Sequence, residues 1–164
     1  MKRNRVARLV LFAAAAQFAA ANAAWAGTCA SPVEKAAFDS RVLQNELMVA
    51  ALTCGETTRY NAFVTKFQPQ LTEHGKTLKA YFARVYGKRG EHELNNFMTR
   101  IANAATMRRM QMSMQDYCTS SVGLFNAATA VEPTSLVVFA SQTTFVSNSG
   151  VQTCSVQAAR DDNE

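Results

Sequence analysis

The sequence predicts an all-α fold: a four- to five-helix bundle with an irregular C-terminal segment and two disulfides. Apolar residues recur with a helical period through most of the chain, and helix-start and helix-stop signals divide the pattern into segments. An even number of cysteines, four, follows an export signal. We expect a signal peptide over 1–26 and a helical domain over 27–131. A C-terminal segment over 132–164 should pack on, or be tethered to, the bundle and finish in a disordered acidic end.

The N-terminus has the pattern of a secretory signal peptide. MKRNRVAR carries cations and no acid, an alanine-rich apolar run follows, and an A-x-A exit stands at 24–26. Gln17 and Asn22 interrupt the apolar run and no stop-transfer pattern follows, which disfavours a membrane anchor. Cys29 raises the alternative of a lipoprotein, but the residues before it form a poor lipobox. We expect cleavage after Ala26 and a periplasmic or secreted mature chain without an integral membrane segment.

Cleavage changes the charge balance of the chain. The full sequence has 17 Lys+Arg against 12 Asp+Glu, a formal net charge of +5. Lys2, Arg3, Arg5 and Arg8 belong to the leader, so the mature chain has 13 cations against 12 anions, or +1. A nearly neutral domain gives no electrostatic reason to expect nucleic-acid binding. The remaining residues, 164 less 26, are enough for one domain with a real core.

The cysteines Cys29, Cys54, Cys118 and Cys154 are expected to form two disulfides. None of these cysteines belongs to a CxxC or CxxH motif, which disfavours a zinc site and a thioredoxin-like redox site. Four cysteines allow three connectivities, and the sequence alone does not choose between them. Our hypothesis is Cys54–Cys118 within the helical body and Cys29–Cys154 joining the two ends.

The first helix is predicted from the SPVE sequence at 31–34 to about Cys54. Serine can cap the helix, proline suits its first position, and the glutamate completes a capping box. Gly55 is a natural C-cap, and a kink near 39–40 stays open. The ELMVAALTC stretch at 46–54 is apolar on almost every side, which predicts a central, buried helix.

Three further helical stretches follow. An apolar stripe over 60–85 is interrupted by Pro69, which either begins a new helix or kinks one. Another stripe begins near Gly90 and places the apolar residues of 94–105 together. Ser113 resembles the N-cap of a helix that runs to about Ala130. The LVVFA run that follows, at residues 136 to 140, fits a short helix or a strand, because its period alone does not decide.

The stretch MRRMQMSMQ is the most unusual in the chain. Its methionines are Met107, Met110, Met112 and Met114. Thioethers are soft ligands that suit Cu(I), but methionine is also an adaptable packing residue. Met112 falls on the core stripe and Met114 near the next apolar face, whereas Met107 and Met110 fall on the outer face. Packing or partner contact is therefore favoured over a copper site, and Arg108 and Arg109 disfavour a bound cation.

Other chemistry-bearing residues are sparse. His74 and His92 each follow a glutamate, but neighbours in sequence do not face each other on a helix. No GxSxG, GxGxxG or P-loop is present. Glu46 is an acid on an otherwise apolar helix, so if buried it needs a partner such as Arg59 or Arg100.

Two stretches, ELMVAALTCG at 46–55 and YNAFVTKFQPQL at 60–71, resemble small exported helical proteins of alphaproteobacteria, most of them uncharacterised. The resemblance covers roughly residues 40–125. It implies a periplasmic, cysteine-bearing helical domain, and it brings no activity, ligand or catalytic residue to particular positions.

We therefore predict a non-enzymatic binding or structural module of the cell envelope, with no catalytic residue and no cofactor. Its partner would be a protein or an envelope component, bound at the Met107/Met110 face or in the groove beside Pro69. Two alternatives stay open. One is a periplasmic Cu(I)-handling protein that uses Met107, Met110 and Met114. The other is a cell-wall or lipid hydrolase built around Glu46 and a histidine.

Overall fold

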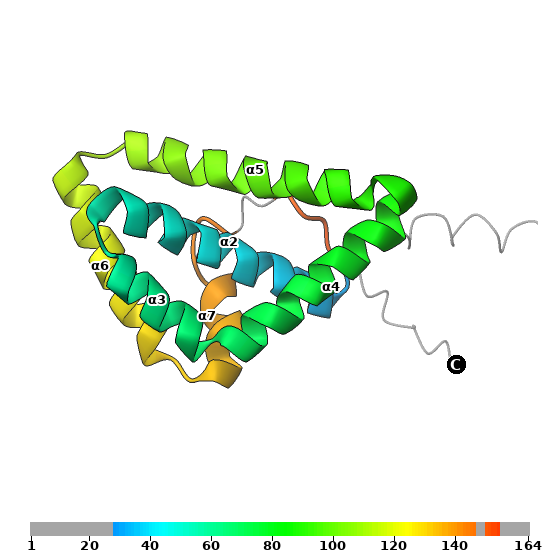
Figure 1. Ribbon diagram of the computed structural model, residues 1–164, viewed down its shortest axis with the longest axis horizontal. Coiled ribbons are helices and arrows are strands. Elements are labelled where there is room, and N and C mark those ends of the chain that lie inside the picture. The colour runs from blue at the N-terminus through cyan, green and yellow to red at the C-terminus, as the bar shows by residue number, and fades with distance from the viewer. Residues whose placement is uncertain (1–27, 147–149, 155–164) are drawn as a thin grey trace, which may run out of the picture. The chain divides into compact units, whose positions relative to one another are not determined.

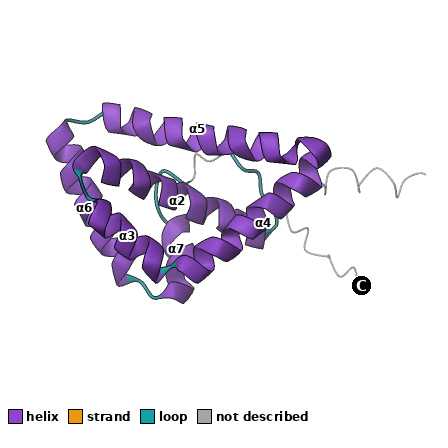
Figure 2. Cartoon of the chain, in the orientation of Figure 1, coloured by secondary structure: helices purple, strands orange, loops and turns teal. Residues whose placement is uncertain are grey.

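The computed structural model describes residues 28–146 and 150–154, which fold as helices joined by short connections (Figures 1 and 2). The longer helices are α2 (Pro32–Cys54), α3 (Thr57–Lys66), α4 (Gln68–Tyr86), α5 (Gly90–Met110) and α6 (Met114–Ala130). Shorter elements complete the fold: η1 (Gly87–Arg89), η2 (Pro133–Ser135) and α7 (Leu136–Ser141). The predicted all-α bundle is confirmed. The predicted signal peptide and acidic end lie outside the described residues.

Helix α2 is the central element and packs against α3, α4, α5, α6 and α7 (Figure 1). The Ser31 hydroxyl accepts the Glu34 N–H at 3.3 Å, and the Glu34 carboxylate accepts the Ser31 N–H at 2.8 Å. This is the predicted capping box. The helix ends at Gly55, whose φ of 73° favours a residue without a side chain. Leu52 departs from the expectation of burial on all sides, because it is 75% exposed.

The core has two halves, one along each half of α2. The C-terminal half of α2 packs with α3, α6 and α7 through residues that include Leu47, Phe63 and Phe125. The N-terminal half packs with α4 and α5 around Phe38, whose ring lies 4.9 Å from that of Tyr81 between centroids. Edge-to-face contacts of this kind add to the burial of the rings.

Helices α4 and α5 form a V. They meet at η1 and separate with distance from it (Figure 1). Pro69 stands in the first turn of α4, where the missing proline N–H costs no hydrogen bond, so the alternative of a new helix is correct and that of a kink is wrong. Helix α2 packs against both arms of the V.

The C-terminal part of the described chain is tied to the bundle. The 136–140 run, open between helix and strand in the sequence, forms α7, and its Leu136 and Ala140 are buried. Within the described ranges, strand-like pairing is limited to an isolated parallel bridge between Ala30 and Thr153. There the Cys154 N–H donates to the Ala30 carbonyl at 3.0 Å.

Both predicted disulfides are present. Cys54, the last residue of α2, is bonded to Cys118 on α6, with 5.6 Å between their Cα atoms. Cys29 is bonded to Cys154.

In the part of the chain described here, no single helix has both the length and the apolar character to cross a membrane. One bent pair, Met114–Ala130 with Pro133–Ser141, meets these criteria when taken together.

Candidate functional site

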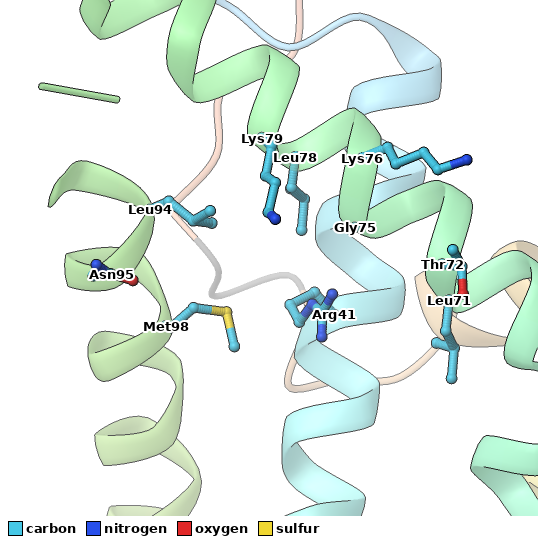
Figure 3. Close-up of a pocket in the computed structure, with 10 residues that line it drawn as sticks. All are labelled: Arg41, Leu71, Thr72, Gly75, Lys76, Leu78, Lys79, Leu94, Asn95 and Met98. Atoms are coloured by element: carbon cyan, nitrogen blue, oxygen red, sulfur yellow. The ribbon is translucent and has the colours of Figure 1, made fainter. Parts of the chain in front are cut away.

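A pocket of about 420 Å³ lies between the arms of the V, with α2 as its floor (Figure 3). This volume is in the range typical of small-molecule sites. The lining residues come from three helices: Arg41 from α2; Leu71, Thr72, Gly75, Lys76, Leu78 and Lys79 from α4; and Leu94, Asn95 and Met98 from α5. The pocket is therefore built by the helix arrangement rather than by a loop.

Gly75 helps to keep the pocket open. A Cβ atom at this position would lie 3.2 Å from Nη2 of Arg41. Any larger side chain would extend into the space that the Arg41 guanidinium faces. Glycine is unfavourable inside a helix by about 1 kcal/mol relative to alanine. Its presence in the middle of α4 is thus accounted for by the room that it leaves above Arg41.

The charged groups of the pocket are all positive. Arg41, Lys76 and Lys79 line it, and no acidic residue does. In Figure 3 the Lys79 side chain runs into the space between α4 and α5, whereas Lys76 points away from Arg41. A negatively charged group in the pocket would therefore meet two cations, Arg41 and Lys79, and no repelling carboxylate.

Arg41 has no carboxylate partner among the described residues, whose ion pairs involve other cations. Its Nη1 donates to the side-chain oxygen of Gln44 at 2.8 Å, which fixes one end of the guanidinium. The side chain is half-buried, and burial lowers the pKa of Arg41 from the ordinary value of arginine. Buried cations are usually paired with an anion, so an unpaired one is a candidate ligand contact.

A smaller recess adjoins the pocket and shares Arg41 and Met98 with it. Its volume is about 60 Å³, and its other lining residues are Gln44, Asn45, Met48 and Tyr60. Asn45 is only 4% exposed, and its side-chain nitrogen has no hydrogen-bond partner within the described chain. Buried polar groups nearly always have a partner, so this donor is placed to bond to a water or a ligand group that enters the recess.

His74 lies on α4 directly before Gly75. Burial lowers its pKa from the ordinary 6.5, the positive charge of Arg41 on α2 lowers it further, and Glu73 on α4 raises it. The unfolded chain therefore binds a proton more readily than the folded protein just below pH 6.5. The free energy of unfolding should be highest above that pH and should decrease as the pH falls toward the folded-state pKa.

We expect His74→Gln to flatten this pH dependence in urea unfolding measured from pH 7.5 to about 5. His92→Gln is the matched control, because His92 is exposed at the start of α5. That variant should keep the slope of the wild-type protein. An unchanged slope in His74→Gln would show that the pH dependence arises from other groups.

The MRRMQMSMQ stretch, residues 107 to 115, spans the end of α5, the turn that follows and the start of α6. All four of its methionines are exposed, with exposed fractions of 58% for Met107, 64% for Met110, 45% for Met112 and 48% for Met114. The expected burial of Met112 is wrong, because α5 ends at Met110 and the stripe does not continue. Arg109 approaches the sulfur of Met114 at 3.7 Å. The interaction-surface and copper hypotheses for Met107, Met110 and Met114 stay predictions.

Glu46, whose burial the sequence left open, is buried on α2 and forms a salt bridge with Arg108 of α5. The expected partners were wrong: Arg59 pairs with Glu56, and Arg100 lies over the Phe97 ring. In the described chain Glu46 is thus neutralised by an arginine rather than set beside a histidine. The hydrolase hypothesis, which needs Glu46 as an acid or base, gains no geometric support.

Sequence reasoning did not identify the pocket residues. The prediction named a groove beside Pro69. Pro69 lies in the first turn of α4, and this helix supplies Leu71 and Thr72 to the pocket wall. Two signals were available: Gly75 within a helical stripe, and Arg41 one turn before Asn45 on the helix predicted to be central. In the part of the chain that is described, no group of three His, Cys, Asp or Glu side chains could hold a metal ion.

Comparison with protein-family models, curated proteins and solved structures finds no match to this chain. Its function is therefore inferred from its own residues.

Proposed function

We propose that this protein is an exported, non-enzymatic binding module of the cell envelope, and that its binding site is the pocket between α2, α4 and α5. The N-terminal sequence supports export, because it has the basic head, apolar run and A-x-A exit of a signal peptide. The two disulfides agree with an oxidising compartment.

The observation that carries the proposal is the unpaired charge of Arg41 at the floor of the pocket. Structural arginines of a core normally meet a carboxylate, as Arg108 meets Glu46 in this protein. Arg41 instead lines a pocket of about 420 Å³ and, with Asn45, the small recess that adjoins it. A core built only for stability would have filled this space or paired this charge.

The test is native mass spectrometry of the protein produced with its own leader in an exporting bacterial host. We expect a mature chain that begins at Gly27, lacks four hydrogens because of its disulfides, and carries a small molecule that is lost on denaturation. Gly75→Leu should be exported and folded without this mass, because the leucine side chain would occupy the space beside the Arg41 guanidinium. Gly123→Leu is the matched control, since a Cβ there meets nothing within 4 Å.

Two results would contradict the proposal. A chain that keeps its leader in the cytoplasm would contradict the envelope location. A wild-type protein without added mass, or a Gly75→Leu variant that retains it, would contradict the assignment of the pocket as the binding site.

A further inference from the structure

We infer that the pocket takes a single-chain amphiphile with a compact anionic head, such as a medium-chain carboxylate. The head would lie at Arg41, and the chain would run along α5 toward η1. This inference rests on the proposed binding function and specifies the class of ligand.

The head-group site is defined by Arg41 and Lys79, which both line the pocket. Gln44 holds Nη1 of Arg41, and Nη2 packs beside the backbone of Gly75, so the guanidinium is fixed in place at the pocket. A guanidinium matches the two oxygens of a carboxylate, and charge-assisted hydrogen bonds of this kind are among the strongest in proteins. The Lys79 ammonium, which points into the pocket, supplies a second and more flexible positive charge (Figure 3).

The walls of the pocket are mostly apolar. Most of this apolar surface comes from Leu94 and Met98 on α5, which are partly exposed, because Leu78 and Leu71 on α4 are themselves buried. An inorganic anion would satisfy Arg41 but would leave these side chains against water. A methylene chain would cover them, and each buried CH₂ group contributes about 0.8 kcal/mol. Met98 can adapt to chains of different shape, because its side chain is flexible.

The space between α4 and α5 extends from this pocket toward η1, which indicates where the methylene chain of the ligand would lie. A second hollow of about 400 Å³ shares Lys79, Leu94 and Asn95 with the first and extends to Gly87 and Gly90 beside η1. Glu91 lines that far end and would repel an anionic head. An anionic amphiphile therefore has one favourable orientation, with its head at Arg41 and its tail between the arms of α4 and α5.

The experiment is calorimetric titration of the mature, disulfide-bonded protein with decanoate below its micelle concentration. Decyltrimethylammonium has the same chain with a positive head, and acetate has the head without the chain. We expect decanoate to bind at least about tenfold more tightly than either, because each lacks one of the two interactions.

Two pairs of variants test the assignment of residues. Lys79→Met should weaken decanoate binding several-fold more than Lys76→Met, although both remove one positive charge, because Lys76 points away from Arg41. Arg41→Met should weaken it by about tenfold or more, which corresponds to one strong ionic contact. Gly75→Leu should abolish binding and Gly123→Leu should preserve it. Unfolding curves for each variant confirm that the fold is kept.

Equal affinity for decanoate and decyltrimethylammonium, or full affinity in Arg41→Met, would overturn the inference. Its failure is distinguishable from that of the proposed function. If decanoate does not bind, but the exported protein carries a molecule that Gly75→Leu lacks, the binding function stands and the ligand class is wrong. If neither result is obtained, both are wrong.

Discussion

Replacing both Cys54 and Cys118 by alanine is expected to lower the free energy of unfolding by about 4 kcal/mol, the largest change in stability that we predict. The bond joins residues 64 apart in sequence. Without it, the unfolded chain gains the conformational freedom of a long loop, whereas the folded protein loses only one covalent contact. The double variant is preferred to a single one, because it leaves no unpaired thiol to form a new disulfide.

The slope of the urea transition identifies the origin of this loss. If the bond acts on the unfolded state, its removal should expose more surface on unfolding and raise the denaturant m-value. A loss of stability at constant m-value would instead place the effect in the native packing of the two side chains. An unchanged free energy of unfolding would contradict the prediction altogether. Far-UV circular dichroism of the folded variant should still show the wild-type helix content.

The local signals of the sequence predicted the ends of helices. Ser31 and Glu34 form the capping box that starts α2, Gly55 ends that helix, and Ser113 caps α6 through the Asp116 N–H. Each of these features depends on residues within one helical turn, so it can be read without knowing the fold. The helical period similarly predicted the apolar faces of α4 and α5.

The features that depend on how helices meet were not predictable in this way. Arg108 is 62 residues from Glu46, and only the path of α5 across α2 brings them together. The pocket has the same origin, because Arg41, Gly75 and Met98 come from three helices. Hydrophobic periodicity states which face of a helix is buried, but it does not give the angle at which two helices cross. The candidate site is thus a consequence of packing rather than of any motif.

Gly90→Ala is expected to destabilise the protein by about 2–3 kcal/mol, the cost of overpacking a close contact. Gly90 is buried where α5 begins against the end of α4. A Cβ atom there would lie 2.8 Å from the Phe82 carbonyl oxygen and 2.9 Å from the Ala83 nitrogen. Both are backbone atoms, which cannot rotate away as a side chain does. The two helices must separate, and the contact between the Phe82 and Phe97 rings, now 5.9 Å between centroids, must lengthen.

Gly123→Ala is the control for Gly90→Ala, because the two substitutions should change the free energy of unfolding in opposite directions. Both glycines are in helical segments, and Gly123 is exposed in the middle of α6, with nothing within 4 Å of a Cβ atom. Helix propensity alone favours alanine by about 1 kcal/mol, so Gly123→Ala should raise the free energy of unfolding. Urea unfolding of the two variants should therefore shift in opposite directions. A stabilising Gly90→Ala would mean that α4 and α5 are not in close contact at the apex of the V. The spacing of α4 and α5 at the pocket would then not be set by the contact of Gly90 with Phe82 and Ala83.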